Sequence, residues 1–234
     1  MTRPGKVCGW ESIWADLDAL PDYWRVPEPA VLGWAERLWQ AGGRRVLDLG
    51  CGIGRHTVAL ARLGLDVVAA DVSYSGLAAC AAWLIREGLR ASLVHHGAET
   101  FPFSDYAFDG LLAFHAIYHN TLDGMRRTLA EMHRVLATGG WLYLTANARD
   151  EGRMATYQAE IAAGRCREIE PFTFVWPHET GDKSLPHHHC DEAELRDLLA
   201  GFAVDDLDLV RREYVDDDGT FRVRAHYHVR AYRL

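Results

Sequence analysis

The sequence predicts an α/β protein with a doubly wound, mostly parallel sheet, helices on both faces and an antiparallel strand towards its C-terminal end. Two observations support this prediction. Short apolar runs alternate with longer segments of helical periodicity, and glycines end most of those segments. Such alternation produces right-handed crossovers between parallel strands, whose helices cover both faces of the sheet. The 234 residues, 49% of them hydrophobic, suffice for one domain with a substantial core.

Residues 1–42 are predicted to form an N-terminal helical cap on this sheet. The segment WESIWADLDAL has the apolar spacing of a short helix. Three prolines within PDYWRVPEP then interrupt the helical pattern. A second helix is expected over about 29–41, because it begins with a proline and is followed by two glycines.

Residues 43–147 contain five predicted strands separated by helical segments. The strands are RRVLDLG, DVVAAD, ASLVHH, FDGLLAF and WLYLTAN. Helices are expected to begin at Arg55, after Ser73 and at about Thr121. In sheets of this kind ligands bind beyond the carboxyl ends of the strands. We therefore expect the functional site among the residues that directly follow the strands.

Residues 148–190 interrupt this pattern, and residues 191–234 resume it. The first range contains a possible helix and then a long irregular run that ends in LPHHHC, so it is predicted to be an insertion. In CDEAELRDLLAGF, Asp191 and Glu194 have the spacing of a capping box before a helix. The last two apolar segments predict an antiparallel pair of strands around a turn at 216–219.

The composition narrows the range of partners and locations. A formal net charge of -8 disfavours nucleic acid and anionic membranes as partners. The five cysteines are scattered and form no CxxC, which is typical of a reducing compartment. No run approaches the roughly 18 apolar residues of a membrane span, and the first residues lack the apolar stretch of a signal peptide. We therefore expect a cytoplasmic protein, either a monomer or a homodimer, without a membrane or nucleic-acid partner.

The stretch VLDLGCGIGR, residues 46–55, places three glycines at the end of the first predicted strand. Glycine lets the backbone turn tightly and approach a ligand closely. The spacing is GxGxG, whereas a dinucleotide fingerprint, GxGxxG, needs a glycine where Arg55 stands. Asp71 ends the second strand, where a carboxylate can accept hydrogen bonds from both hydroxyls of a ribose. The two features favour a nucleoside ligand and argue against a nicotinamide-dependent or flavin-dependent oxidoreductase.

Four segments in this order resemble those of the class I S-adenosylmethionine-dependent methyltransferases. They are VLDLGCGIGR, DVSYSGL, ETFPFSDYAFD and EMHRVLATGGWLYL. The segments LAFHAIYHN and LPHHHCDEAELRDLLAGF are similar to a small-molecule branch that includes tellurite-resistance-like and many uncharacterised bacterial methyltransferases. The resemblance implies a Rossmann-like fold, S-adenosylmethionine as cofactor and a small-molecule methyl acceptor. It also implies that the insertion at 148–190 covers the acceptor pocket.

The resemblance further implies which residues hold the cofactor. The glycine loop would line the methionine part of the cofactor, and an acidic residue of the first strand would orient its amino group directly or through water. Residues after the second and fourth strands would contact its ribose and adenine. This set is Asp48, Gly50, Cys51, Gly52, Gly54, Asp71, Val72, Gly97, Ala98 and Phe114. Gly97 stands where the family usually has a carboxylate, so the backbone of Gly97 and Ala98 is left to meet the adenine.

Histidines and aromatic residues are the candidates for the acceptor pocket. The predicted pocket residues are Tyr23, Trp24, His115, His119, His187 and His188. His119 and His188 are the candidate general bases, needed only if the acceptor must lose a proton. For each histidine the alternative is a bond to loop backbone or exposure to solvent, and Tyr23 and Trp24 equally suit packing of the cap. The imidazoles with Cys190 or Glu170 could ligate zinc, but no metal site is predicted, because no spacing matches a known ligand signature.

Two other functions stay open at this level. A nucleic-acid methyltransferase shares the same cofactor pattern, although the acidic balance and the lack of a Lys/Arg stripe argue against it. A non-catalytic cofactor-binding module also shares that pattern, and a pocket open to an acceptor would distinguish an enzyme from it.

Overall fold

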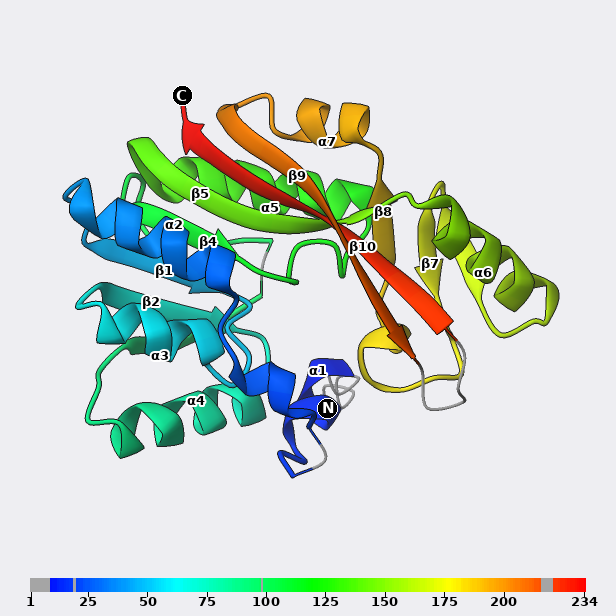
Figure 1. The fold of residues 1–234 in the computed structure, drawn as a ribbon, viewed down its shortest axis with the longest axis horizontal. Coiled ribbons are helices and arrows are strands. Elements are labelled where there is room, and N and C mark those ends of the chain that lie inside the picture. Colours follow the sequence, from blue (N-terminus) through cyan, green and yellow to red (C-terminus); the bar gives the residue numbers. More distant parts are fainter. Residues whose placement is uncertain (1–8, 19, 98, 216–220) are drawn as a thin grey trace, which may run out of the picture.

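The computed structural model describes residues 9–18, 20–97, 99–215 and 221–234, which form an α/β fold around one twisted sheet (Figure 1). In spatial order the main strands are β3 (Ser92–His95), β2 (Asp66–Asp71), β1 (Arg45–Leu49), β4 (Phe108–Ala113), β5 (Leu136–Ala148), β10 (Phe221–Arg233) and β9 (Phe202–Val215). The first five strands are parallel, whereas β10 runs antiparallel to both β5 and β9. The predicted doubly wound sheet with antiparallel C-terminal strands is confirmed. The turn expected at 216–219 lies outside the described residues.

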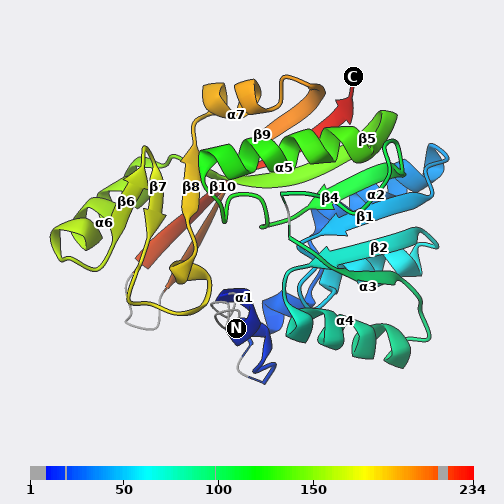
Figure 2. The same cartoon turned by 180° about the vertical axis from the view of Figure 1, so that it is seen from behind.

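Helices cover both faces of this sheet (Figure 2). On one face lie α2 (Pro29–Gln40), α3 (Arg55–Arg62) and α4 (Tyr74–Arg86), and on the other α5 (Leu122–Val135) and α7 (Glu192–Leu198). Successive residues of a strand point to opposite faces, and so Val46 packs against α2 while Leu47 packs against α5. Strands that are apolar on both sides are typical of a parallel sheet buried between helices.

The segment 148–190 is more regular than the irregular run expected from the sequence. It forms α6 (Glu151–Ala162), β6 (Arg167–Glu170), β7 (Thr173–Val175), a 3-10 turn η2 (Gly181–Ser184) and β8 (His187–Cys190). β8 adds in parallel to the end of β5, and β7 and β6 follow it antiparallel. The HHHC run is therefore a fully buried strand rather than a loop. Polar residues fill this strand because its imidazoles find hydrogen-bond partners on both sides.

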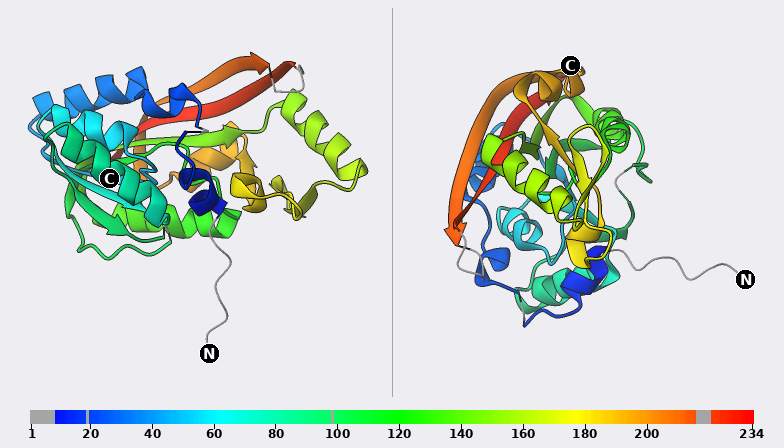
Figure 3. Two further views of the ribbon diagram at one scale, coloured as in Figure 1. Left: turned by 90° about the horizontal axis from the view of Figure 1, so that it is seen from below. Right: turned by 90° about the vertical axis from the view of Figure 1, so that its right-hand side faces the viewer.

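The N-terminal cap crosses to the carboxyl ends of the strands. α1 (Gly9–Trp14) is shorter than the helix expected from WESIWADLDAL and lies between α4 and η2 (Figure 3). A short 3-10 turn, η1 (Asp22–Arg25), connects it to α2, which packs on the sheet through Trp34. Across the described ranges, we find no helix with the length and apolar character needed to cross a membrane.

Candidate active site

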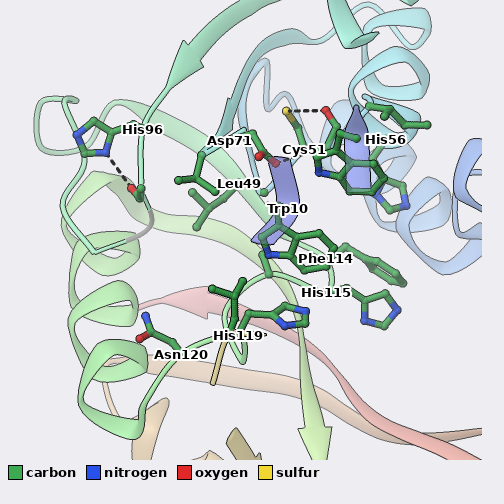
Figure 4. A pocket seen from close by; sticks show the side chains of 18 of the residues that line it. Trp10, Leu49, Cys51, His56, Asp71, His96, Phe114, His115, His119 and Asn120 are labelled. Atoms are coloured by element: carbon green, nitrogen blue, oxygen red, sulfur yellow. Dashed lines mark hydrogen bonds between the residues drawn. The ribbon is translucent and has the colours of Figure 1, made fainter. Parts of the chain in front are cut away.

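A cavity of about 440 Å³ opens at the carboxyl ends of β1, β2 and β4 (Figure 4). Ten of the residues expected at the site line it, namely Trp24, Gly50, Cys51, Gly52, Asp71, Val72, Gly97, Phe114, His115 and His119. The position follows from topology, because the loops after neighbouring parallel strands converge at one edge of the sheet. The volume falls within the range of small-molecule and cofactor sites, roughly 300–1,000 Å³.

The glycine loop forms the floor of this cavity. Gly50 and Gly52 have positive φ angles of 72° and 53°, which L side chains rarely adopt. A Cβ atom on Gly50 would come within 2.6 Å of the Ala116 side chain, and one on Gly52 within 2.9 Å of the Trp14 ring. The loop is therefore glycine-rich for both conformation and close packing.

Asp71 connects the glycine loop with the end of β2. One carboxylate oxygen accepts a hydrogen bond from the Gly52 amide and the other from the Ser73 amide, each at 2.8 Å. The residue is 6% exposed, and burial raises the pKa of its carboxyl group, opposed by these amide bonds. Asp71 thus organises the loop and also lines the cavity.

Asp48, which was predicted to orient the cofactor amino group directly or through water, does not line the cavity. Its carboxylate accepts a 2.6 Å hydrogen bond from the Thr57 hydroxyl inside the β1–α3 packing. Burial raises the pKa of Asp48 to about 6. Asp48 therefore stabilises the start of α3, and only the tertiary structure shows this direction of its side chain.

Gly54 also lies behind the cavity wall rather than on it. It precedes α3 with a φ of 92°, and a Cβ atom there would overlap the Cys80 sulfur of α4. Gly54 is therefore needed for helix packing rather than for a direct ligand contact. Ala98, the remaining predicted cofactor residue, lies outside the described residues.

Gly54→Ala should lower the stability of the fold by roughly 2–5 kcal/mol, because it combines a left-handed backbone cost of about 1–2 kcal/mol with overpacking of about 1–3 kcal/mol. The matched control is Gly42→Ala, since Gly42 has a φ of 94° and open space around its Cβ position. Denaturant unfolding of both variants separates the two costs. Equal losses for the two variants would contradict the packing role of Gly54.

Aromatic residues of the N-terminal cap cover the cavity. Trp14 stacks on Trp10 with ring centroids 5.7 Å apart, and Trp24 meets Trp14 edge-on at 5.1 Å. Trp10 also packs edge-on against His119 at 4.7 Å. Tyr23, expected beside Trp24 in the pocket, is 54% exposed and does not line the cavity. It stacks on the outer side of Trp24 instead.

His119 and His187 meet beside the cavity. Their rings are 4.7 Å apart, and the His187 Nε2 atom lies 3.8 Å from an Asp182 carboxylate oxygen. His119 is at the cavity wall, whereas His187 stands behind it. Burial holds the pKa of His119 well below its usual value, so its ring is neutral at pH 7. Its Nδ1 atom is buried and has no hydrogen-bond partner among the described residues.

His188 points away from the cavity, contrary to its predicted role as a base. Neighbouring residues of a strand face opposite sides, so His187 and His188 cannot both approach His119. The His188 ring contacts Thr173 at 2.7 Å and Glu194 at 3.4 Å. Glu194 in turn accepts a 2.7 Å bond from Arg149, and Cys190 lies nearby. His188 therefore belongs to a buried polar network that joins β8 to α7.

His115 is held in an uncommon conformation at the cavity wall. Its φ is 55°, its amide donates to the Thr145 hydroxyl at 2.8 Å, and its Nδ1 atom is 2.7 Å from the Tyr118 hydroxyl. A non-glycine residue with this φ is strained, and such strain concentrates at functional sites. Burial lowers the pKa of His115 as well, so this ring too is neutral.

Several cavity residues were not predicted from the sequence. They include Trp10, Trp14, Arg55, His56, Asn120 and Leu185. Two signals pointed towards them, namely the crowding of tryptophans in the first 40 residues and the position of Arg55 directly after the third loop glycine. No local pattern distinguishes a tryptophan that covers a ligand from one that packs on a sheet.

Comparisons with known proteins agree with this geometry. Residues 46–140 match the family model described as a methyltransferase domain. An uncharacterized methyltransferase of Mycobacterium tuberculosis is 34% identical over 160 residues, which are 64% of this chain and 61% of the relative. The demethylmenaquinone methyltransferase of Clavibacter sepedonicus is 37% identical over 98 residues, which are 42% of this chain and 39% of that protein.

A solved structure supports the fold over most of the chain. The S-adenosylmethionine-dependent methyltransferase of Methanosarcina mazei superposes with a TM-score of 0.70 at 22% identity, covering 89% of this chain and 99% of that one. The matched sequence segment holds the glycine loop, Asp71 and the end of β4, the elements that build the cavity. Residues 46–140 of the chain therefore match a methyltransferase domain, and the chain shares the fold of a solved S-adenosylmethionine-dependent methyltransferase.

Proposed function

We propose that this chain binds S-adenosylmethionine in the cavity and transfers its methyl group to a small-molecule acceptor in the cytoplasm. The observation that carries the proposal is the pair formed by the glycine loop and Asp71, which lie on the wall of one cavity. The chain spans about 61% of the length of its uncharacterized relative, so activity and acceptor are proposals.

The residues present fit this cofactor. Gly50 and Gly52 line the cavity and carry no side chain, so the loop offers bare backbone to a ligand. Asp71 would hold the ribose, because each carboxylate oxygen can accept a further hydrogen bond besides its amide. Val72 and the backbone of Gly97 would contact the adenine. When bound, S-adenosylmethionine supplies a methyl group made electrophilic by its sulfonium.

The remaining residues would align the acceptor and exclude water. The indoles of Trp10, Trp14 and Trp24 cover the cavity and form apolar walls around it. His119 would accept a proton from an acceptor that must lose one, since its ring is neutral and its Nδ1 atom has no described partner. His187, paired with Asp182, would orient His119 from behind.

Three observations favour a small acceptor over nucleic acid. The net charge is -8, and Arg55 is the only arginine or lysine among the described residues that line the cavity. The demethylmenaquinone methyltransferase that matches this chain is named for a small acceptor. Apolar and aromatic side chains line much of the cavity, among them Leu49, Ile53 and Phe114 beside the three tryptophans, which suits a compact organic molecule.

The proposal is tested first by calorimetry with S-adenosylmethionine, S-adenosylhomocysteine and NAD. We expect saturable binding of the first two and none of NAD. Incubation with radiolabelled S-adenosylmethionine and a panel of metabolites should then identify the acceptor. Binding of NAD alone would contradict the cofactor. Methylation of RNA or DNA in place of any small molecule would contradict the acceptor class.

Glu11 should contribute to cofactor binding from outside the cavity. Its carboxylate accepts 2.6 Å bonds from the hydroxyls of Ser73 and Ser75, which fasten α1 to the start of α4 and keep Trp14 against Gly52. These bonds also lower the pKa of Glu11.

We expect Glu11→Ala to raise the Kd for S-adenosylhomocysteine about three- to tenfold. This loss is smaller than that of a full charge-assisted hydrogen bond, which contributes roughly 1.5–3 kcal/mol, because Glu11 is partly exposed. Calorimetry measures the change. Glu36→Ala, on the exposed side of α2, is the matched control and should leave the Kd unchanged. Equal affinities of both variants would show that α1 does not take part in binding.

A further inference from the structure

Arg55 is placed where its charge can act inside the cavity. It is the first residue of α3 and lines the cavity wall. Its guanidinium carbon lies 5.0 Å from the centre of the Phe114 ring and 5.8 Å from the centre of the Trp24 ring. The two rings hold the flat guanidinium between the N-terminal cap and the end of β4.

The polar contacts of Arg55 leave most of its donors free. Its Nη1 atom donates to the carbonyl oxygens of Tyr23 and Val26 at 3.3 and 3.5 Å, both long bonds. Among the described residues no carboxylate lies within ion-pairing distance of Arg55, and its Nε and Nη2 atoms have no acceptor. The nearby acid Glu28 is already paired with Arg212 at 2.6 Å.

No acid pairs directly with Arg55 among the described residues, although the charges of Glu28 and Asp48 partly oppose the effect of burial on its pKa. His56 accepts a bond from the Glu28 amide at 3.1 Å, and burial lowers its pKa well below the usual value, so it is neutral. His115 and His119 are neutral for the same reason. Burial also lowers the pKa of Arg55 itself, yet a guanidinium stays charged at any physiological pH.

The acids of the cavity are engaged elsewhere. Asp71 accepts bonds from two backbone amides, and Glu99 pairs with Arg127 at 2.9 Å. A half-buried cation without a partner is costly, and a carboxylate that docks beside it in a bidentate pair offsets that cost. The cavity therefore has an anion-binding position between aromatic walls.

We infer that the acceptor is an aromatic carboxylate whose carboxylate group pairs with Arg55 while its ring packs against Trp24 and Phe114. This inference rests on the proposed function, since it names the substrate class of the same site. Apart from Phe114, which the cofactor and the acceptor would share, the contacts of Arg55 are with the cap, and none is with Asp71, Val72 or Gly97, which we assign to the nucleoside. Arg55 is then a specificity-determining residue for the acceptor.

The test uses the full chain saturated with S-adenosylhomocysteine and matched pairs of probes. Each pair is an aromatic carboxylate and its neutral amide: benzoate and benzamide, salicylate and salicylamide, indole-3-carboxylate and its amide, 2-naphthoate and its amide. Quenching of tryptophan fluorescence, checked by calorimetry, gives each Kd. We expect at least one carboxylate to bind ten times or more tightly than its amide.

Arg55→Gln should bring that ratio to within twofold of one and leave the Kd of S-adenosylhomocysteine within threefold of wild type. Arg55→Lys should keep part of the preference, because the charge stays but the bidentate fork is lost. The matched control is Arg62→Gln in the last turn of the same helix, where the side chain is exposed and pairs with Glu87. It should keep the full preference, and circular dichroism checks that all variants are folded.

Two results would overturn the inference. One is that no carboxylate binds better than its amide. The other is that Arg55→Gln weakens S-adenosylhomocysteine more than tenfold but leaves 5′-methylthioadenosine unchanged, because the partner of Arg55 would then be the cofactor's own carboxylate. A wild-type chain that binds no S-adenosylhomocysteine contradicts the proposed function instead. The probe pairs are then titrated without it, and the carboxylate preference still decides the role of Arg55.

Discussion

Replacing Asp71 with alanine should weaken the binding of S-adenosylhomocysteine at least about a hundredfold. Hydrogen bonds to a charged group contribute roughly 1.5–3 kcal/mol each, and a factor of one hundred corresponds to only about 2.7 kcal/mol. The variant loses the acceptor for the ribose hydroxyls. It also leaves the amides of Gly52 and Ser73 without their 2.8 Å partner, so the glycine loop loses its shape.

Calorimetry with S-adenosylhomocysteine measures this loss, and Asp66→Ala is the matched control. Asp66 begins the same strand, β2, at the opposite end from the cavity, and its side chain is 62% exposed. The control should bind as wild type does. Asp71→Asn should fall between the two, because its amide group keeps one acceptor oxygen but turns a donor towards a backbone amide. Unchanged affinity in a folded Asp71→Ala protein would falsify the ribose role.

Replacing His119 with glutamine should reduce turnover by about 10²- to 10⁴-fold for an acceptor that loses a proton, the usual contribution of a general base. Glutamine keeps polarity and approximate size but cannot take up a proton at neutral pH. The Kd of S-adenosylhomocysteine should change less than threefold, because the glycine loop and Asp71 stay intact. Labelled methyl transfer to the identified acceptor measures the rate.

The pH profile gives this prediction a second measurement. Because burial keeps the pKa of His119 well below its usual value, the wild-type ring stays neutral as the pH falls from 8 to 6.5. The acid limb of kcat/KM due to His119 should therefore appear only below pH 6.5, and His119→Gln should abolish it. His178→Gln, at an exposed position, is the control. If the His119→Gln variant turns over at the wild-type rate, His119 is not the general base of the reaction.

The sequence determined the fold and the positions of the glycine loop and Asp71, because these depend on local patterns. Apolar runs and helical periodicity define strands and helices, and their alternation leaves few topologies for a parallel sheet. The glycines of residues 50–54 follow β1, and Asp71 ends β2. Residues at the ends of neighbouring parallel strands converge at one edge, so their proximity follows from topology alone.

The arrangement of the histidines was decided by the tertiary structure, because it depends on side-chain direction and on contacts between distant segments. The run HHHC forms a strand because it pairs with β5. Successive residues of a strand face opposite sides, so His187 lies beside His119 and His188 lies beside Glu194. The sequence had predicted an irregular run for this segment. Periodicity cannot reveal a strand that forms only by adding to an existing sheet edge.

The same reason accounts for the residues whose roles changed. Asp48 turned to Thr57 because α3 brings a hydroxyl beneath β1, and Gly54 faces Cys80 because α3 and α4 pack closely. The contact of Arg55 with Trp24 depends on the packing of the N-terminal cap, which is distant from Arg55 in the sequence. Sequence patterns specify which elements form and where strands end. Packing between elements specifies which side chains face the ligand, since that choice is made by neighbours far away in the chain.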